Sequence, residues 1–573
     1  MLLKTKYVPV CQNDMRDNGW DSVDIVLISG DAYIDHPAFG VSLLARFLIE
    51  KDFRVGIIAQ PQKDEDFLAL GRPKLFFGIS SGNVDSMVSH YTAQRKIRSN
   101  DDYSPNSKPG MRPDRAVLIY TQKVKQLYKD VIVVIGGVEA SMRRIPHYDF
   151  MSDKIKNSIL IDSKASILVY GNGESQLLEI AYRIQNKKNI DGILGTCSYS
   201  SVVPDTAVQT DFPKNNDDFF HMTKHFYENH LTKTWYYLYN NRYLIHYPPA
   251  KALSTEDLDS IYNLPFSRES HIQYKGKFIK AFEQIKYSIL SHRGCYGGCS
   301  FCSIAVHQGK VIQSRSKESI MKEIGSLSKK SYFKGTISDI AGASANMYGT
   351  YCKAKISQTC QKRSCLYPEV CKDLSFNEKY YLSVLQGAYA ASKVKNVFIS
   401  SGVRIDLALL QPDFVRELAC FYTSGSLKVA PEHINEEVLK MMHKPPIMKY
   451  LNFAGIYLDI CKKIEKKQFI IPYLIVGFPG CTLENALELA IFLKKNNLCV
   501  EQIQEFTPTP MTIATMMYFT GKDYDTGKDI YVPKGREIKL QKALAQWYMK
   551  ANKKLVIEAL KKLNRLELIS FFQ

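Results

Sequence analysis

The 573-residue sequence lacks any apolar stretch that approaches the roughly 18 residues of a membrane-spanning helix. Its first residues, MLLKTKYVPVCQND, contain no apolar segment and no small-residue cleavage site, so a secretory signal is not expected. We therefore expect a cytoplasmic protein without a membrane partner. In a reducing compartment the 13 cysteines stay reduced, and any cluster of them is a candidate for metal binding or catalysis.

The sequence also lacks a G-x-G-x-x-G motif that opens a helix, so no nicotinamide site is predicted. Hydrophobic residues make up 45% of the chain, enough for more than one core, and the length favours two large α/β domains with appendages. The 76 lysines and arginines exceed the 57 acidic residues by 19, a balance that attracts nucleic acid. The lysines are scattered along the chain, however, so charge alone does not establish a nucleic-acid partner.

Short apolar runs alternate with helix-like segments over the first 200 residues. Near-continuous valine and isoleucine runs of this kind are typical of a parallel sheet covered on both faces. The predicted strands are residues 24–28, 54–58, 74–79, 131–137 and 166–171. Several end in glycine-containing turns, where a ligand can approach the backbone. We predict a doubly wound, Rossmann-like domain over residues 1–204, followed by an aromatic-rich connector over 205–280 that packs between domains.

The alternation of strands and helices resumes after residue 281. Six apolar runs fit a partial (β/α)6 barrel of the TIM type over residues 281–520, whose chemistry gathers at the carboxyl ends of the strands. One helix of this unit is expected to begin at Ser316. Residues 521–573 carry apolar side chains at helical spacing and predict amphipathic helices that pack on the barrel.

Three cysteines, Cys295, Cys299 and Cys302, follow the first barrel strand with the spacing C-x3-C-x2-C. Three thiolates can hold three irons of a 4Fe-4S cube and leave the fourth iron without a protein ligand. A structural zinc site would instead take four ligands. The open iron is the reason to expect catalysis, although the spacing assigns no catalytic residue.

On this spacing, the aromatic Phe301 before the third cysteine and the place after a barrel strand, the sequence resembles the radical SAM superfamily. The resemblance implies that the three cysteines ligate the cluster and that S-adenosylmethionine chelates the open iron. Reductive cleavage of S-adenosylmethionine then gives a 5′-deoxyadenosyl radical, which abstracts a hydrogen atom from an unidentified substrate. It also implies an electron donor such as flavodoxin or ferredoxin.

Over nearly its whole length the sequence resembles the YgiQ-type family of this superfamily. The segments that carry the resemblance are GDAYIDHP at 30–37, GGVEAS at 136–141, SFCSI at 300–304, APEH at 430–433 and FTPTP at 506–510. This family has no settled substrate, so the resemblance implies the cofactor and not the reaction.

The resemblance implies that S-adenosylmethionine is contacted at the carboxyl ends of the barrel strands. The candidates are Gly342, Ser401, Arg404, Glu432 and Gly477. Gly342 lies where superfamily members carry a glycine-rich turn, although the alanines on either side of it depart from that pattern. Arg404 is suited to a carboxylate, and Glu432 to ribose or substrate.

A second group of cysteines lies in an insert at residues 349–375. Its members, spaced C-x7-C-x4-C-x5-C, are Cys352, Cys360, Cys365 and Cys371. The surrounding lysines and glutamines do not fit a buried core, so the sequence predicts a four-thiolate site. It would hold an auxiliary 4Fe-4S cluster or zinc.

Two alternative functions remain open. The positive charge and the aromatic connector are compatible with an RNA-modifying radical SAM enzyme. Alternatively, both cysteine groups are structural in a nonenzymatic zinc-stabilised binding protein, with His292 or His307 as the fourth ligand of the first group. The first domain could share the corrinoid-binding fold, but residues 35–40 do not match the pattern D-x-H-x-x-G that corrinoid enzymes often present.

Overall fold

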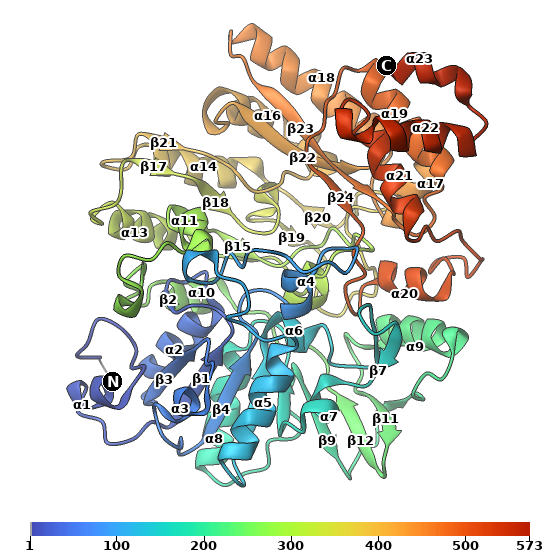
Figure 1. Ribbon diagram of the computed structural model, residues 1–573. Helices are drawn as coiled ribbons and strands as arrows, with labels where there is room; N and C mark the ends of the chain where they lie inside the picture. Colours follow the sequence, from blue (N-terminus) through green and yellow to red (C-terminus); the bar gives the residue numbers. More distant parts are fainter. Residues whose placement is uncertain (1–2, 573) are drawn as a thin grey trace.

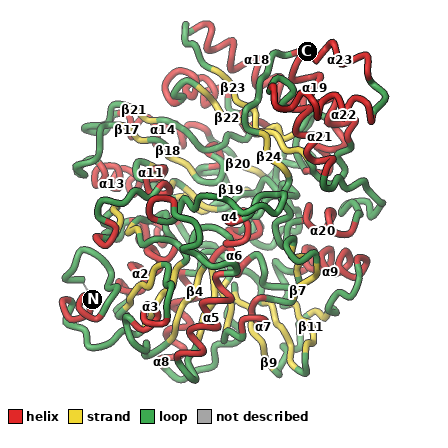
Figure 2. The backbone as a smooth tube through the Cα atoms, in the orientation of Figure 1, coloured by secondary structure: helices red, strands yellow, loops and turns green. Residues whose placement is uncertain are grey.

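A computed structural model describes residues 3–572. The chain forms an N-terminal half around a large sheet and a C-terminal half of shorter strands and helices, which lie one above the other in Figure 1. Loops fill much of the layer between the halves (Figure 2).

The five strands predicted near the start of the chain are present and pair in parallel. They are β1 (Ile25–Ser29), β3 (Val55–Ala59), β4 (Phe76–Ser80), β5 (Val133–Gly136) and β8 (Ile167–Val169). Their spatial order is β3-β1-β4-β5-β8. This order reverses direction between β1 and β4, as in doubly wound sheets. The predicted α/β fold with a large, mostly parallel sheet is confirmed.

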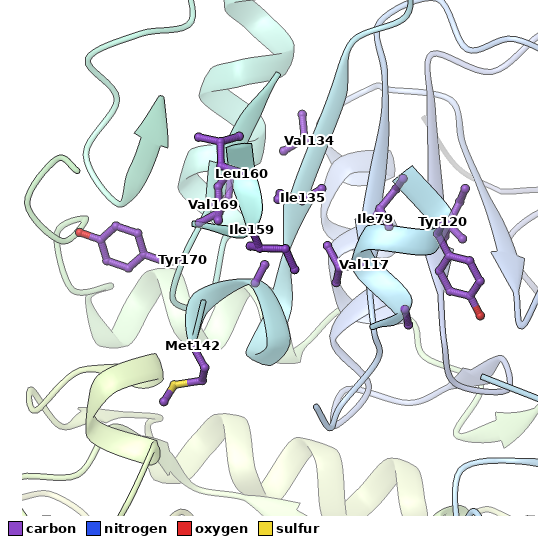
Figure 3. Packing of buried hydrophobic residues seen from close by; sticks show 14 of the residues in the cluster. Ile79, Val117, Tyr120, Val134, Ile135, Met142, Ile159, Leu160, Val169 and Tyr170 are labelled. Atoms are coloured by element: carbon purple, nitrogen blue, oxygen red, sulfur yellow. The ribbon is translucent and has the colours of Figure 1, made fainter. Parts of the chain in front are cut away.

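Helices cover the sheet in two groups. One group contains α2 (Gly40–Glu50) and α8 (Glu174–Gln185), which contact each other. The other contains α3 (Asp64–Leu68), α5 (Ala116–Leu127) and α7 (Ile159–Ser163), with α5 touching both neighbours. The short helix α6 (Gly137–Ser141) directly follows β5. Figure 3 shows side chains of β4, β5 and β8 packed against α5 and α7.

The aromatic segment expected to connect two domains instead extends the N-terminal sheet. It adds β10 (Val208–Gln209), β11 (Trp235–Tyr239) and β12 (Arg242–His246), with α9 (Asn216–Asn229) between β10 and β11. They join the sheet through β9 (Thr196–Ser200), which lies at the end of the predicted N-terminal domain. Trp235 and Tyr237 are fully buried whereas Leu238 is half exposed, so the segment has the alternation of a strand. Aromatic side chains on both faces hid this alternation in the sequence.

The six strands predicted in the C-terminal half are also present. They are β14 (Ser288–Leu290), β18 (Asp339–Ala341) with the adjoining β17 (Thr336–Ile337), β21 (Asn396–Val397), β22 (Ser426–Glu432), β23 (Phe469–Val476) and β24 (Ile503–Glu505). Parallel pairs join them in sequence order, with a single bridge between Val403 and Val429 completing the series. Within residues 3–572 no pair joins the first strand to the last, so this half is an open arc and not a closed barrel.

Helices alternate with these strands and continue to the end of the described chain. They include α13 (Lys317–Leu327), α14 (Glu378–Tyr389), α15 (Ile405–Ala408), α18 (Ile447–Lys463), α19 (Leu483–Lys495), α20 (Ile513–Thr520), α21 (Arg536–Ala545), α22 (Lys553–Lys562) and α23 (Ile569–Phe572). Ser316 caps α13 as expected, because its hydroxyl accepts a hydrogen bond of 3.0 Å from the Ser319 amide. The predicted tail helices pack through α21 onto α19 and β24. None of the helices in the described range is both long and apolar enough to cross a membrane.

One hydrophobic core passes through both halves. The cluster that contains Ile28 and Ile135 of the N-terminal sheet also contains Val438, Phe478 and Met517 of the C-terminal half. Met142, which follows α6 and is fully buried, lies on the side of this core nearest the C-terminal half (Figure 3). The carboxyl ends of the N-terminal strands are therefore held against the second half of the chain.

Candidate metal and cofactor site

The three cysteines of the C-x3-C-x2-C motif lie on a tight loop after β15 (His292–Arg293), which pairs with β16 (Gln313–Ser314). All three are free thiols of intermediate exposure. The Gly297 amide lies 3.5 Å from Sγ of Cys295, and the Cys302 amide donates a hydrogen bond of 3.2 Å to the Cys299 carbonyl. Gly298 has a φ of 66°, and a Cβ there would lie 2.7 Å from Ser364, so the turn requires glycine.

The thiols are close enough to influence one another. Burial raises the pKa of Cys302 to about 12, and the charges of Cys299 and Cys295 add to the shift. Burial also raises the pKa of Cys295, whereas Arg404 opposes that shift. Metal ligation requires the thiolate form, so a cation at this loop favours the state that binds metal.

Arg404 is the cation that contacts the cysteine loop. Its Nη1 donates a hydrogen bond of 3.2 Å to Sγ of Cys299, while Nε and Nη2 bind Asp406 at 3.1 and 2.6 Å. A Cβ on Gly297 would lie 3.0 Å from Nη1, so the missing side chain leaves room for the guanidinium. The structure thus places Arg404, a predicted cofactor contact, beside the cysteines that are predicted to ligate the cluster.

Glu432 also lies near the cysteine loop. It ends β22 with a left-handed φ of 71° and is 8% exposed. Burial raises the pKa of Glu432, and Lys444, whose Nζ lies 3.9 Å from the carboxylate, opposes this shift. The charge of Glu432 in turn raises the pKa of Cys302. Arg404 opposes the shift of Glu432 as well, and the buried carboxylate oxygens keep capacity for a further hydrogen-bond partner.

The other three predicted cofactor contacts have protein partners. A Cβ on Gly342 would lie 2.4 Å from the His292 carbonyl oxygen. The Ser401 hydroxyl donates a hydrogen bond to Asp339. Gly477 donates a hydrogen bond of 2.8 Å from its amide to Gln541. Their roles toward S-adenosylmethionine remain predictions.

A cavity of about 180 Å³, the cluster-side cavity, lies in front of the cysteine loop. Cys299 and Cys302 line one wall, and Arg144, Tyr170 and Glu174 of the N-terminal half line another. The insert contributes Gln361, Lys362 and Arg363. Three parts of the chain that are distant in sequence therefore enclose the space beside the cysteines.

A second cavity of about 420 Å³, the switch-point cavity, lies at the carboxyl edge of the N-terminal sheet. It is lined by Ser29 and Ser80, where the strand order reverses, and by apolar residues of α2 and α8. Both cavities share the segment 171–174 and His307 in their walls. Ligands of open α/β sheets bind at this edge, next to the reversal of strand order.

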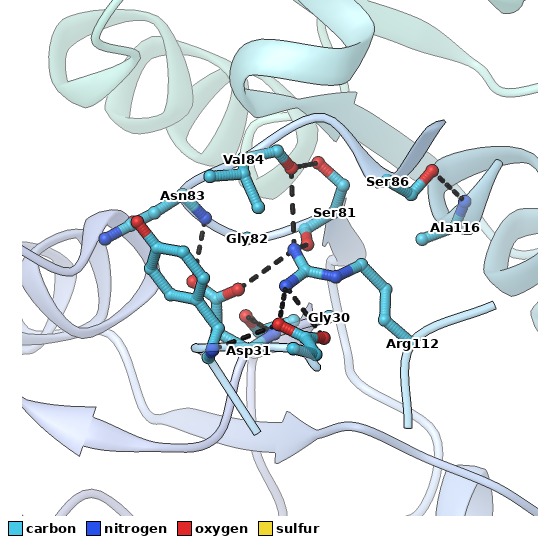
Figure 4. A network of polar contacts seen from close by, with 12 residues as sticks. Gly30, Asp31, Ser81, Gly82, Asn83, Val84, Ser86, Arg112 and Ala116 are labelled. Carbon is cyan, nitrogen blue, oxygen red and sulfur yellow. Dashed lines mark hydrogen bonds and ion pairs between the residues drawn. The ribbon is translucent and has the colours of Figure 1, made fainter. Parts of the chain in front are cut away.

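Arg112 binds Asp31, a lining residue of the switch-point cavity, in the polar network of Figure 4. Its guanidinium donates a hydrogen bond of 2.6 Å to the Ser81 carbonyl and pairs with Asp31 at 3.1 Å and Asp101 at 3.2 Å. Burial raises the pKa of Asp31 to about 6, although Arg112 opposes the shift. The loops after β1 and β4 are therefore joined by one fully buried cation.

The cysteine-rich insert packs directly on the first cysteine loop. Cys352 lies on β19 (Tyr351–Cys352), which pairs with β20 (Leu374–Ser375). The Cys365 amide donates a hydrogen bond of 3.0 Å to the Tyr296 carbonyl, and the Ser364 hydroxyl donates one of 2.9 Å to the Gly297 carbonyl. The two cysteine groups thus share one wall.

The four insert cysteines are brought near one another and near Lys310. Burial raises the pKa of Cys365 to about 11. The charges of the other three insert cysteines raise it further, whereas Lys310 lowers it. Lys310 Nζ donates hydrogen bonds to the carbonyls of Cys360 and Lys362. Within residues 3–572 no three histidine, cysteine or acidic side chains converge on a point suited to one metal ion. A cube takes one thiolate on each iron, so its ligands need not converge in that way.

The sequence did not reveal Lys310, Arg144 or His307 as site residues. Lys310 is one of many lysines, and its position against the insert depends on the fold. Arg144 follows Arg143, and nothing in the dipeptide shows which arginine faces a cavity. The sequence offers His307 only as a zinc ligand, and its place in the walls of both cavities depends on the fold.

Comparisons with known proteins identify the family that the chain resembles. Residues 7–288 match the family model described as radical SAM N-terminal, and residues 501–573 match a domain of unknown function (DUF3362). A UPF0313 protein of Geobacter sulfurreducens is 44% identical, covering 98% of this chain and 95% of its own. One of Methanocella arvoryzae is 43% identical, covering 98% and 96%.

A solved structure of similar fold is the radical S-adenosylmethionine methyltransferase TsrM from Kitasatospora setae, with cobalamin and a [4Fe-4S] cluster bound. The TM-score is 0.51 at 14% sequence identity, and the match covers 86% of this chain and 74% of the other. At this identity the likeness concerns the fold alone.

Proposed function

The chain belongs to the UPF0313 family of radical SAM proteins, and from this premise we propose that it is an enzyme that cleaves S-adenosylmethionine reductively. The observation that carries the proposal is the group of three neighbouring free thiols beside a cavity, with Arg404 on Cys299. The membership in the radical SAM superfamily predicted from the sequence is confirmed. The substrate is not identified.

Cys295, Cys299 and Cys302 would hold the 4Fe-4S cluster, since they supply three thiolates and no fourth cysteine lies on their loop. When bound, such a cluster supplies one electron to the sulfonium of S-adenosylmethionine and starts radical chemistry through the 5′-deoxyadenosyl group. An electron donor such as flavodoxin or ferredoxin would serve as the redox partner.

The residues of the chain orient the reactants and exclude water. Arg404 balances the negative charge of the thiolates, because its guanidinium is permanently charged and bonded to Cys299. We interpret the open arc of six strands as the predicted partial barrel, in which Gly342, Ser401, Glu432 and Gly477 at the strand ends are the proposed contacts of S-adenosylmethionine. The N-terminal half and the insert both line the cavity, and their side chains would limit the access of water to a radical formed there.

The test is the release of 5′-deoxyadenosine from anaerobically reconstituted protein supplied with dithionite and S-adenosylmethionine. We expect brown protein with about four irons per cluster and measurable nucleoside release. Cys299→Ala should abolish release, whereas Cys499→Ala, which changes an exposed thiol, should retain it. Equal release from Cys299→Ala and the parent protein would refute the assigned site.

Of the two metals expected in the insert, the cysteines Cys352, Cys360, Cys365 and Cys371 would hold an auxiliary 4Fe-4S cluster, because no three metal-binding side chains of residues 3–572 converge on a point suited to a single zinc ion. Four mutually influencing thiols and a neighbouring lysine support this proposal. Counting iron, sulfide and zinc in the parent protein and in a Cys365→Ser, Cys371→Ser double variant tests it. A loss of about four irons indicates a cluster, a loss of one zinc indicates a zinc site, and an unchanged metal content rejects both.

A second candidate is a cobalamin-dependent radical SAM enzyme. The observation that favours it is the switch-point cavity, which adjoins the cluster-side cavity in a chain whose fold resembles that of cobalamin-bound TsrM. Asp35 is engaged by Arg46 at 2.6 Å, and His36 lies outside the residues that line the cavity. A corrinoid here would therefore bind without that histidine.

Retention of hydroxocobalamin through gel filtration, followed by its visible absorption, tests the second candidate. Val138→Trp, in the cavity wall, should lower the retained amount, whereas Val202→Trp at an exposed position should not. No retention by the parent protein would reject it. The RNA-modifying and zinc-stabilised binding alternatives gain no support from the described residues.

A further inference from the structure

Arg144 is a fully buried arginine in the wall of the cluster-side cavity. It is 1% exposed. Its Nε donates a hydrogen bond of 3.0 Å to Nε2 of His246, and Nη1 donates one of 2.7 Å to the Ser141 carbonyl. The guanidinium lies 4.5 Å from the ring centroid of Tyr170. All of these partners are neutral groups.

Arg144 differs in this respect from the other buried arginines. Within residues 3–572, each other arginine that is at least nine-tenths buried pairs with an aspartate or glutamate: Arg46, Arg112, Arg143, Arg268, Arg293, Arg315 and Arg404. Arg144 has no such ion pair in this range, and its Nη2 donates no hydrogen bond there. The neighbouring Arg143 pairs with Asp85. The uncompensated charge is therefore specific to the residue that faces the cavity.

Arginine keeps its charge even when buried, and a buried charge is costly to a protein unless an opposite charge accompanies it. Burial lowers the pKa of Arg144, and no carboxylate opposes the shift. Stacking on Tyr170 compensates only part of the lost hydration. The remaining counter-charge has to come from the cavity.

No carboxylate in the cavity wall supplies that counter-charge, and Arg404 already lies on the thiol of Cys299. Glu174 is the one acidic residue among the lining residues, and it pairs with Arg293 at 2.7 Å. His307 binds the Ser141 hydroxyl at 3.0 Å, and burial, with Arg144 and Arg293, lowers its pKa to about 4. The imidazole is therefore neutral near pH 7 and adds no charge of either sign.

We propose that Arg144 binds a carboxylate or phosphate group of the substrate in the cluster-side cavity. A guanidinium presents parallel N–H donors that match two oxygens of either anion. The inference rests on the proposed function, because it takes the cavity beside Cys299 and Cys302 to be the substrate site. It restricts the substrate to an anionic molecule.

Anion binding to the reconstituted full-length protein tests the proposal, with inorganic phosphate and acetate as probes at constant ionic strength. We expect saturable binding by calorimetry and a rise in the unfolding temperature. Arg144→Met should weaken the response at least tenfold. Arg144→Lys should weaken it less, because it keeps a charge without the planar pair of donors. Tighter phosphate binding indicates a phosphorylated substrate, and tighter acetate binding a carboxylic acid.

Arg242→Met is the matched control. Arg242 also stacks on a tyrosine, at 4.4 Å from the Tyr199 ring, but does not line the cavity. The Arg242→Met protein should bind phosphate and acetate as the parent protein does. If Arg144→Met fails to fold, the decision rests on Arg144→Lys, in which unchanged anion affinity would overturn the proposal.

Two further outcomes would also overturn it. One is an equal anion response from Arg144→Met and the parent protein. The other is loss of anion binding when saturating S-adenosylmethionine is present, since the site would then belong to the carboxylate of that cofactor. The anion titrations need no turnover, whereas 5′-deoxyadenosine release by the parent protein and Arg242→Met tests the proposed function. The two failures are therefore distinguishable.

Discussion

Arg404 donates one hydrogen bond to Sγ of Cys299 and two to the carboxylate of Asp406, so that a single guanidinium joins the cysteine loop to the start of α15. A permanent positive charge in this position favours the thiolate over the thiol. It also presents a fixed hydrogen-bond donor to the sulfur that is proposed to ligate iron. Hydrogen bonds from side chains outside the ligand set orient and tune the ligands of a metal site.

Replacing Arg404 with Met should weaken metal retention at the first cysteine group. Loss of the charge leaves buried thiols without their nearest cation, and outer contacts of this type are worth roughly 10- to 100-fold in metal affinity or activity. We expect faster iron loss to a chelator and at least tenfold slower 5′-deoxyadenosine release. Arg416→Met, which changes a largely exposed arginine, is the control. Identical iron loss in both variants would contradict the role of Arg404.

Gly342→Ala should destabilise the protein, because the added Cβ would lie 2.4 Å from the His292 carbonyl oxygen. Overpacking of this kind costs about 1–3 kcal/mol. Gly325→Ala is the matched control, since no atom lies within 4 Å of its added Cβ and the position is inside α13. It should stabilise the helix by about 0.5–1 kcal/mol. Urea unfolding measures both changes, and equal midpoints would contradict the close contact.

Ser364→Ala should loosen the junction between the insert and the first cysteine loop. The hydroxyl donates to the Gly297 carbonyl at 2.9 Å and accepts from the amides of Leu366 and Tyr367. Leaving these buried groups unpaired should cost about 2 kcal/mol. Ser260→Ala removes an exposed helix hydroxyl and should change stability by less than about 0.5 kcal/mol. A similar unfolding midpoint for both variants would show that the junction does not depend on Ser364.

Acid should destabilise the protein below about pH 6.5. Burial lowers the pKa of His147 to about 3, and Arg143 adds to the shift, so the folded protein keeps this ring neutral. Unfolding lets the ring take up a proton once the pH falls below its ordinary pKa of about 6.5, which favours the unfolded state by about 1.4 kcal/mol per pH unit. This contribution to stability is present above pH 6.5 and is lost progressively toward pH 3.

His147→Asn should reduce the pH dependence of stability between pH 7 and 5, by about 2 kcal/mol at pH 5. Chemical denaturation at each pH measures the change. His221→Asn, at an exposed position, should leave the dependence unchanged. Parallel pH profiles for His147→Asn and the parent protein would contradict the neutral buried state.

The sequence predicts the strands well where they are buried on both faces. Runs such as 131–137 contain so little polar material that only a covered parallel strand accommodates them. The β11 strand was missed because an aromatic ring at nearly every position conceals which side chains point inward. The pairing of β9 with β12 joins residues more than 40 positions apart, which no local pattern reveals.

The candidate site divides in the same way. The spacing of Cys295, Cys299 and Cys302 is a local signal, so it was found. The difference between Arg143 and Arg144 depends on Asp85, which lies 58 residues from Arg143 in sequence and beside it in space. Which acidic residue neutralises a given arginine depends on tertiary contacts, and the sequence alone does not show those contacts.

The two halves of the chain share one hydrophobic core, so neither is expected to fold independently of the other. This core contains Ile28, Ile135, Val438, Phe478 and Met517. Separating the two halves would expose a large apolar surface on each fragment, and we expect both fragments to aggregate. Substitutions in the N-terminal half that alter substrate specificity during evolution must therefore preserve its apolar contacts with the C-terminal half.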